Sequence, residues 1–271
     1  MRSCPIARLS GPSGSGKTTT AMKIAEALRG MGIGSQSLAM DDYFRTVNPR
    51  TAPRTPEGDI DFESPACLDM DLLGKHLNAL ARGEEIHLPR YNFVTRVQSG
   101  PIGRPMRLGK DEVVVCEGIH ALNDDIAAYC PDAFRLYISA RSVVVDGDGQ
   151  EIFKGTWMRL LRRLVRDSNF RGTPAAATLD MWANVRRGEK RFISPFKERA
   201  NLMFDSSFPC EVSIMKNFAA PLLAAVPEGA ERYTEIRSIL PALDRFETID
   251  PALLAPESML REFIGGGVYS Y

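Results

Sequence analysis

Short apolar runs alternate along this chain with longer segments of helical periodicity. Five runs have the length of buried strands, at residues 6–10, 37–40, 113–116, 133–139 and 210–215. The run at 113–116 reads Val-Val-Val-Cys without a polar interruption, which is typical of a parallel strand covered on both faces. It ends at Glu117, and the run at 37–40 ends at the pair Asp41 and Asp42.

Between these runs, apolar residues recur at the spacing of helices. One series is followed by glycines and consists of Ala21, Ile24, Ala25, Leu28 and Met31. A second series begins at Asp69 and closes at Gly83. Strands that alternate with helices predict an α/β fold with a parallel, doubly wound sheet. The ligands of such a sheet lie outside the carboxyl ends of its strands.

Three further segments interrupt this alternation. Residues 45–60 are rich in proline, threonine and arginine and predict a loop at the rim of the ligand site. Short alternating stretches broken by glycine and proline predict a small β-hairpin insertion at about 85–109. We expect a helical lid at about 156–190, a helical segment at about 219–271, and one domain over all 271 residues.

Composition narrows the classes of protein. Lysine plus arginine and aspartate plus glutamate each number 34, so a formal charge of zero argues against a nucleic-acid binder. No apolar stretch is long enough for a bilayer span or a signal sequence, which predicts a cytoplasmic protein with no membrane partner. The five cysteines and three histidines lack metal-ligand spacing. The oligomeric state stays open, with a homo-oligomer as one alternative.

The first apolar run leads into the sequence Gly-Pro-Ser-Gly-Ser-Gly-Lys-Thr at residues 11–18, a complete phosphate loop. Its backbone N–H groups are expected to surround a polyphosphate at a helix N-terminus, with Lys17 on the outer phosphates and Thr18 on Mg²⁺. A chance glycine-rich turn is the alternative. The expected nucleotide contacts are Gly11, Ser13, Gly14, Ser15, Gly16, Lys17, Thr18 and Thr19. The prediction is a P-loop NTPase fold that binds ATP with Mg²⁺.

Two acidic residues follow strands at the same predicted edge. Glu117 stands where P-loop proteins carry the carboxylate that holds Mg²⁺, although an acid there can simply cap a loop. Asp41 follows the second strand and could accept the proton of a substrate hydroxyl. Aspartate pairs also mark turns, so a structural role is the alternative for Asp41.

Arginines repeat within residues 159–171. Arg159, Arg162, Arg163 and Arg166 stand at helical offsets 0, 3, 4 and 7 and share one face. A stripe of arginines with few acidic neighbours repels itself unless an anion meets it, which predicts a lid that closes on ATP. A solvated helix face and a nucleic-acid patch are the alternatives.

The chain resembles the uridine kinase and phosphoribulokinase family, in its bacterial uridine kinase-like nucleoside kinase branch. The resemblance extends from the phosphate loop to the C-terminus and rests on the order of several motifs. These are GPSGSGKTT, MDDYF, DFESPACLD, LPRYNF, CEGIHALN, RLLRRLVRDSNFRG, MWANVRRGEKRFISPF and LREFIGG.

The resemblance implies a role for each matching residue. Asp41 matches the catalytic base and a contact to the metal's water shell, and Glu63 matches the acid that binds sugar hydroxyls. Tyr91 and Phe93 match aromatics that pack on a nucleobase, although they could simply hold the hairpin together. Glu117 matches the Mg²⁺ carboxylate. The lid residues that cover the phosphates are Arg162, Arg163, Arg166 and Arg171.

The chain departs from the family at two positions. Arg96 stands where pyrimidine kinases have a histidine that reads the base edge, and a guanidinium suits a carbonyl or an anionic acceptor. Trp157 stands where the family usually has an aspartate shortly before the lid arginines.

The expected activity is phosphotransfer from ATP, with Mg²⁺, to a small-molecule hydroxyl, first of all the 5′-hydroxyl of a nucleoside. Lys17 and three lid arginines would stabilise charge on the transferring group while Asp41 activates the hydroxyl. A kinase of another sugar, sugar phosphate or hydroxyl-bearing metabolite is the first alternative. A nucleotide-dependent switch without transfer activity is the second, which the acceptor-site residues argue against.

Overall fold

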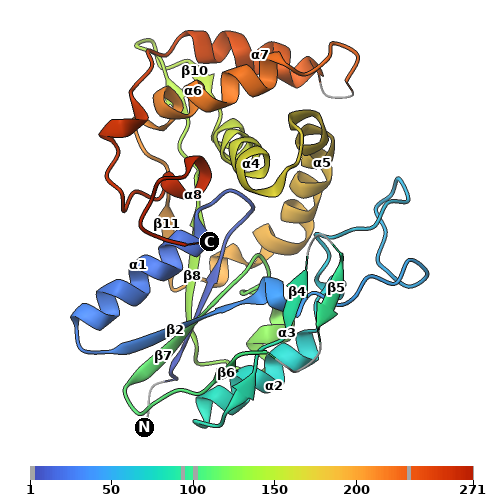
Figure 1. The fold of residues 1–271 in the computed structure, drawn as a ribbon, viewed down its shortest axis with the longest axis vertical. Coiled ribbons are helices and arrows are strands. Elements are labelled where there is room, and N and C mark those ends of the chain that lie inside the picture. Colours follow the sequence, from blue (N-terminus) through green and yellow to red (C-terminus); the bar gives the residue numbers. More distant parts are fainter. Residues whose placement is uncertain (1–3, 93–94, 100–102, 231–232, 271) are drawn as a thin grey trace. The chain divides into compact units, whose positions relative to one another are not determined.

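The computed structural model describes residues 4–92, 95–99, 103–230 and 233–270, which form two compact units (Figure 1). The sheet unit consists of Met1–Pro12, Thr20–Tyr137 and Arg186–Phe204. The lid unit consists of Ser13–Thr19, Ile138–Val185 and Asp205–Tyr271. The phosphate loop from Ser13 onward therefore belongs to the same unit as the lid arginines.

A five-stranded sheet forms the centre of the sheet unit, in the order β11-β8-β1-β7-β2. Its strands are β1 (Ile6–Ser10), β2 (Gly34–Ala39), β7 (Glu112–Glu117), β8 (Phe134–Ser139) and β11 (Leu202–Asp205). β1 pairs in parallel with β7 and β8, and β7 pairs in parallel with β2. The predicted parallel, doubly wound α/β fold is confirmed.

Alternation along the strands explains how the sheet buries both faces. Val114 and Cys116 of β7 lie in one apolar cluster with residues of α2 (Met70–Ala81) and α3 (Asp124–Ala127). Val115, which is also fully buried, points to the opposite face, because successive side chains of a strand alternate. From Thr20 onward, the helix α1 (Lys17–Gly30) belongs to the same unit as this sheet. Asp69 caps α2 by accepting the Leu72 N–H, as the sequence predicts for the start of this helix.

The predicted hairpin insertion is confirmed as two short antiparallel ladders. β3 (Ile86–His87) pairs with β6 (Pro105–Met106), and β4 (Arg90–Asn92) pairs with β5 (Val97–Ser99). The predicted rim loop contains a single isolated bridge, between Arg54 and Ile60, among the described residues. It leads from the 3₁₀ turn η1 (Met40–Tyr43) to the 3₁₀ turn η2 (Pro65–Cys67).

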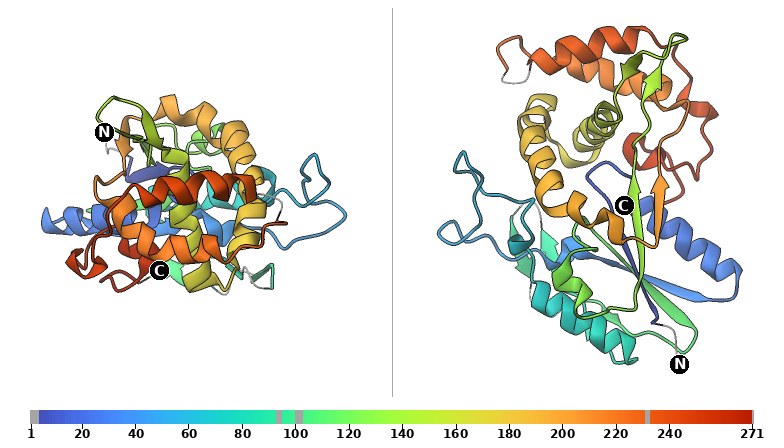
Figure 2. Two further views of the ribbon diagram at one scale, coloured as in Figure 1. Left: turned by 90° about the horizontal axis from the view of Figure 1, so that it is seen from above. Right: turned by 180° about the vertical axis from the view of Figure 1, so that it is seen from behind.

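Helices make up most of the lid unit. They are α4 (Gly155–Arg171), most of α5 (Ala175–Gly188), α6 (Glu211–Ala224), α7 (Tyr233–Asp244) and α8 (Arg261–Ile264). Their apolar faces share one core with the small ladder of β9 (Val144–Val145) and β10 (Glu151–Phe153). α6 and α7 lie side by side in the views of Figures 1 and 2. The helical lid that the sequence predicts corresponds to α4 and α5.

One predicted strand is wrong. Residues 211–215 form the start of α6 and Cys210 is its N-cap, and the fifth strand of the sheet is β11, which the apolar pattern did not single out. Val212, Met215, Ala219 and Leu223 are buried at intervals of three and four residues, so the helical period extends beyond the window that suggested a strand. A six-residue apolar run is too short to distinguish the two periods.

No helix among the described residues is long and apolar enough to cross a membrane.

The central strand carries a buried arginine. Arg8 is 1 % exposed, and its Nε and Nη1 atoms have no hydrogen-bond partner in the described part of the chain. Burial lowers the pKa of Arg8, followed by smaller effects of nearby cysteines and of Arg135. A charged group with unmet donors in an apolar core costs free energy of folding.

We therefore expect Arg8→Met to raise the free energy of unfolding by about 1–3 kcal/mol. Urea denaturation followed by circular dichroism measures this change. The exposed Arg29 serves as a control, since Arg29→Met should change stability by less than about 0.5 kcal/mol. A large loss of stability in Arg8→Met would contradict the account of Arg8 as a net cost.

Candidate active site

The phosphate loop of the lid unit has the backbone that an anion cradle requires. Gly14 and Gly16 have φ values of 75° and 82°, in the left-handed region that favours glycine. α1 begins at Lys17, so the last loop N–H groups point from a helix N-terminus. The hydroxyl of Ser15 is fully buried and has no partner among the described residues, which leaves a donor for a bound phosphate.

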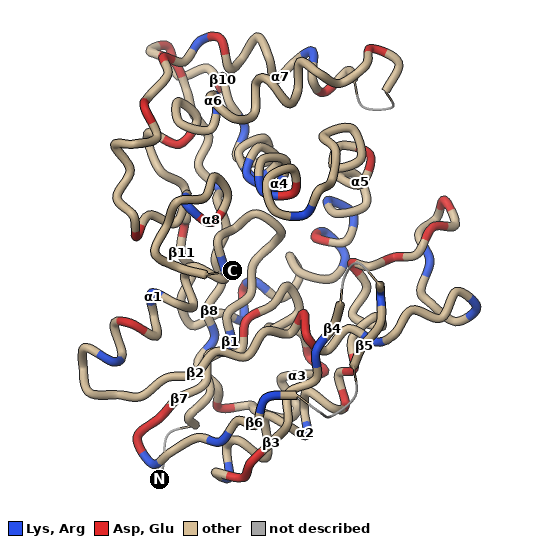
Figure 3. Tube along the Cα trace, viewed as in Figure 1, with Lys and Arg blue, Asp and Glu red and all other residues tan. Residues whose placement is uncertain are grey.

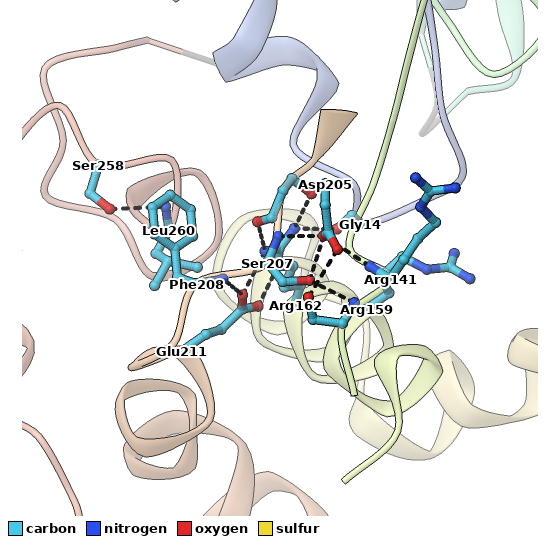
Figure 4. A network of polar contacts seen from close by, with 12 residues as sticks. Gly14, Arg141, Arg159, Arg162, Asp205, Ser207, Phe208, Glu211, Ser258 and Leu260 are labelled. Carbon is cyan, nitrogen blue, oxygen red and sulfur yellow. Dashed lines mark hydrogen bonds and ion pairs between the residues drawn. The ribbon is translucent and has the colours of Figure 1, made fainter. Parts of the chain in front are cut away.

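Arginines of α4 donate hydrogen bonds to this loop (Figure 4). Arg159 donates to the Ser13 carbonyl at 3.3 Å, and Arg163 donates to the Ser13 hydroxyl at 2.9 Å. A Cβ on Gly14 would lie 2.8 Å from the carbonyl oxygen of Arg159, so a side chain there would push the loop away from α4. The lid arginines thus contact the protein's own loop.

Arg162 is the most deeply buried of these arginines. Its side chain and that of Glu211 are both 0 % exposed and form a two-pronged ion pair, with Nη2 of Arg162 and Oε2 of Glu211 2.6 Å apart. Arg162 also donates to the carbonyl of Gly14 at 3.0 Å and to that of Ser206 at 2.7 Å (Figure 4). The guanidinium therefore joins the phosphate loop to α6.

A second acid meets the remaining arginines. Asp167, whose side chain is 3 % exposed, lies 3.2 Å from Nε of Arg163 and 2.7 Å from Nη2 of Arg166. It lies 3.7 Å from Nε of Arg171, which is half exposed. Figure 3 shows the basic residues gathered on α4 with red positions beside them. The expectation of an arginine stripe with few acidic neighbours is wrong, because Asp167 and Glu211 form ion pairs within it.

The C-terminal segment also contacts the phosphate loop and the start of α1, through Met259 and Glu262. The Thr19 hydroxyl and backbone N–H both donate to Oε2 of Glu262, at 2.6 and 3.2 Å. A Cβ on Gly16 would overlap the sulfur of Met259. Because α1 has no acidic residue in its own first turn, Glu262 supplies the negative charge that stabilises this helix N-terminus.

In the sheet unit, two predicted acids lie at the carboxyl edge of neighbouring strands. Glu117 ends β7 and is in register with Ala39 at the end of β2. Asp41 follows in η1 and is exposed, whereas Asp42 is half buried and accepts the Tyr91 N–H. Burial raises the pKa of Asp42, and the nearby charge of Asp41 raises it further. The structure thus brings Asp41 and Glu117 to one edge, as the parallel sheet predicts.

Two predicted acceptor residues, Tyr91 and Arg96, come from the hairpin insertion and contact aromatic side chains of the sheet unit. Tyr91 of β4 is buried, with its ring 5.4 Å from that of Phe44, and its pKa is raised by burial. The guanidinium of Arg96 lies 5.3 Å from the ring centre of Phe62, next to Glu63 in sequence. Phe93 lies outside the described residues.

A cavity of about 340 Å³ opens beside these side chains. Phe44, Phe62 and Cys67 line it together with polar residues of the rim loop, including Arg45 and Asn48. Its volume and mixed lining suit a small polar molecule with a flat ring.

The structure therefore divides the predicted residues between two units. The lid unit holds Ser13–Thr19 and the lid arginines, and the sheet unit holds Gly11, Asp41, Glu63, Tyr91, Arg96 and Glu117. Sequence reasoning missed three acids, Asp167, Glu211 and Glu262. Asp167 had a signal, since it stands four residues from Arg163 and from Arg171. The other two carry no local signal.

The profile of the phosphoribulokinase / uridine kinase family matches residues 6–212. The chain belongs to this family. It is 31 % identical over 196 residues to the uridine kinase of Deinococcus deserti, covering 72 % of this chain and 84 % of that protein. It is 27 % identical over 215 residues to the uridine kinase of Staphylococcus haemolyticus, covering 79 % and 93 %.

Solved structures support the fold. A possible kinase of a fructose transport system from Silicibacter sp. TM1040 superposes with a TM-score of 0.51 at 19 % identity, covering 73 % of this chain and 88 % of that one. A possible uridine kinase from Bacillus stearothermophilus superposes with a TM-score of 0.50 at 19 % identity, covering 76 % and 90 %.

Membership in this family makes the chain an ATP-dependent kinase with a small-molecule substrate. A switch without transfer activity is thereby set aside. At the family's usual aspartate position, Trp157 packs edge-on against Phe153 at 5.5 Å and lies under Lys154. The acids that hold the lid arginines come instead from Asp167 and Glu211.

The buried pair of Arg162 and Glu211 leads to a prediction about stability. Arg162→Ala should lower the free energy of unfolding by about 3–5 kcal/mol, because it leaves the Glu211 carboxylate buried without its partner. The double variant Arg162→Met, Glu211→Met should recover most of this loss, since no charge remains buried. Guanidinium denaturation of the three proteins measures the difference. A fully stable Arg162→Ala protein would contradict a structural role for this ion pair.

Proposed function

We propose that this kinase transfers the terminal phosphoryl group of ATP, with Mg²⁺, to the 5′-hydroxyl of a nucleoside. One observation supports the proposal: the sheet unit contains an exposed carboxylate after β2, a second acid and a cavity lined in part by aromatic side chains. Asp41 lies in η1 directly after β2, and Glu63 is the next residue in sequence after Phe62, which lines the cavity. Such a set can recognise a sugar that carries a flat ring.

On the donor side, the loop and lid bind and orient the phosphates. The N–H groups around Gly14 and Gly16 and the buried hydroxyl of Ser15 would donate to phosphate oxygens. Lys17, with Arg163, Arg166 and Arg171, would stabilise charge on the transferring group. We assign Arg162 a supporting place, because its donors serve Glu211, Gly14 and Ser206.

The residues present fit a Mg²⁺ ion by their chemistry. Thr18 offers a hydroxyl oxygen, and Glu117 and Asp41 offer carboxylate oxygens, which are the hard donors that Mg²⁺ prefers. When bound, the ion would neutralise charge on the phosphates. Asp41 would accept the proton of the acceptor hydroxyl, and Glu63 would orient the sugar through its hydroxyl groups.

A second candidate acceptor is a sugar phosphate or another anionic metabolite. Arg96 favours it, because this residue has a φ of 57°, a left-handed conformation that costs a side chain free energy. Its guanidinium lies over Phe62, in the wall of the cavity. Strain at such a position supports a functional role for the side chain.

The proposed function is tested by acceptor-dependent ADP release. The panel contains uridine, cytidine, adenosine, guanosine, ribose 5-phosphate and fructose, each with ATP and Mg²⁺. A nucleoside should give the highest kcat/KM, with the product phosphorylated at the 5′ oxygen. If only a sugar phosphate accepts the phosphoryl group, the second candidate replaces the first.

Asp41 and its neighbour Asp42 form a matched pair for identifying the base. Asp41→Asn should lower kcat by about 100-fold or more, because an amide cannot take the hydroxyl proton at neutral pH. Asp42→Asn should leave kcat near that of the parent, since an amide oxygen can still accept the Tyr91 N–H. Steady-state kinetics at saturating ATP compares them. Equal loss in both variants would argue against Asp41 as the base.

Asp42 also predicts a pH dependence of stability. Its pKa is raised above the ordinary 3.8, so between these two values the folded state holds a proton that the unfolded state has lost. The contribution of Asp42 to stability therefore falls as pH rises above 3.8. Asp42→Asn should flatten this part of the profile and be at least as stable as the parent at pH 7. Urea denaturation from pH 3.5 to 7 measures the profile, and an unchanged slope would contradict the shift.

Arg96 predicts the selectivity among acceptors. A guanidinium donates hydrogen bonds and accepts none, so the parent should disfavour cytidine, whose exocyclic amino group is a donor. Arg96→His should change the ratio of kcat/KM for uridine and cytidine by about tenfold or more. Arg96→Gly, which relieves the left-handed strain but loses the contact with Phe62, should stay within about 1 kcal/mol of the parent in stability. Unchanged ratios in both variants would exclude Arg96 from the acceptor site.

A further inference from the structure

The C-terminal end of the lid helix α5 contacts the turn that carries Glu63, and both segments belong to the sheet unit. Arg187 lies in the last turn of α5, and its Nη2 is 3.1 Å from Oδ2 of Asp61. The Asp61 side chain is 4 % exposed and that of Arg187 is 24 % exposed, so the pair is largely shielded from water. Asp61 is the ion-pair partner of Arg187 within the described chain.

Asp61 passes this contact on to the turn. Its Oδ1 accepts the backbone N–H of Glu63 at 3.2 Å, while its Oδ2 faces Arg187. Its carbonyl oxygen accepts the Ser64 N–H at 3.1 Å and the Cys67 thiol at 3.3 Å. One aspartate therefore holds the backbone on both sides of Glu63, and its second carboxylate oxygen forms an ion pair with the guanidinium of Arg187 that does not have the geometry of a hydrogen bond.

Gly188 reaches Glu63 directly. A Cβ built at Gly188 would overlap the Cβ of Glu63, so only a hydrogen fits between the end of α5 and this side chain. The backbone of Gly188 is helical, with φ −59° and ψ −43°, and requires no glycine for its own conformation. A π-helical turn, Glu189–Ile193, follows at once, and such turns are frequent at functional sites.

We propose that Arg187 and Gly188 are positioning residues that set the place of the Glu63 carboxylate in the acceptor site. This inference rests on the proposed role of Glu63 as the ligand of the sugar hydroxyls. Arg187 acts through Asp61 on the backbone of the turn, and Gly188 acts on the Glu63 side chain by its small size. The two residues determine affinity for the acceptor and leave the binding of ATP unchanged.

Gly188→Ala and Arg187→Gln test the inference, with two matched controls. Gly30→Ala adds the same methyl group at a helix end with nothing within 4 Å. Arg186→Gln removes the neighbouring charge, which pairs with Glu189 and not with Asp61. Arg187→Lys restores a positive charge toward Asp61. Glu63→Gln measures the role of Glu63 itself.

The measurements are kcat, KM for ATP and KM for the best acceptor of the panel, with urea denaturation of every variant. Gly188→Ala and Arg187→Gln should each raise the KM for the acceptor about tenfold and change the KM for ATP less than about twofold. Arg187→Lys should recover part of the lost affinity, and the two controls should match the parent.

The outcomes separate the inference from the proposed function. If Glu63→Gln weakens acceptor binding but Gly188→Ala and Arg187→Gln do not, the inference fails and the role of Glu63 stands. If Glu63→Gln leaves acceptor binding unchanged, the proposed role of Glu63 and the inference fail together. If Arg187→Gln raises both KM values in parallel with a loss of stability, Arg187 is a structural residue and the inference is overturned.

Discussion

The guanidinium of Arg162 is the contact on which the lid unit depends. It donates to the Gly14 carbonyl of the phosphate loop, to Ser206 and to the carboxylate of Glu211, and it is closed to solvent. Its donors join the phosphate loop to the segment that contains Ser206 and Glu211. Because a buried charge without a partner costs free energy, Arg162 and Glu211 each need the other. Their ion pair also holds the guanidinium in place to donate to the phosphate loop.

Other positive groups of the lid unit are also paired with acidic side chains. Arg163 and Arg166 are held by Asp167, and the N-terminus of α1 is held by Glu262. Positive charge is thus gathered beside the loop, and Asp167 and Glu211 reduce the repulsion between the arginines. Lys17 and the half-exposed Arg171 differ from Arg162 in being less enclosed by protein, which suits contact with a mobile phosphoryl group.

Specificity in the proposed reaction depends on the sheet unit. The parallel strands bring Asp41 and Glu117 to one edge, but the cavity of this unit is lined by the irregular rim loop and by residues directly before and after it. Arg96 has a left-handed backbone conformation and its guanidinium lies over Phe62, and the absence of a side chain at Gly188 leaves space for Glu63. Both features sacrifice some stability at positions next to the candidate acceptor, as functional sites commonly do.

The sequence by itself determined the α/β sheet, the phosphate loop and the helical lid. These follow from local period and local backbone chemistry, as in the continuous run of β7 and the Asp69 cap of α2. It also placed Asp41 and Glu117 at one edge, because parallel strands align their carboxyl ends. It misassigned residues 210–215 and missed β11, since runs of four to six residues fit more than one period.

Only the tertiary structure decided which charges meet. Glu211 lies 49 residues from Arg162, and Glu262 lies 243 residues from Thr19, so no periodicity relates these partners. The contact of Gly188 with Glu63 also cannot be predicted from the sequence, because the helical backbone of Gly188 does not require glycine. Such pairings depend on how distant segments pack. A charge changes stability strongly only where packing excludes water from it, and an added methyl group does so only where another segment lies in contact.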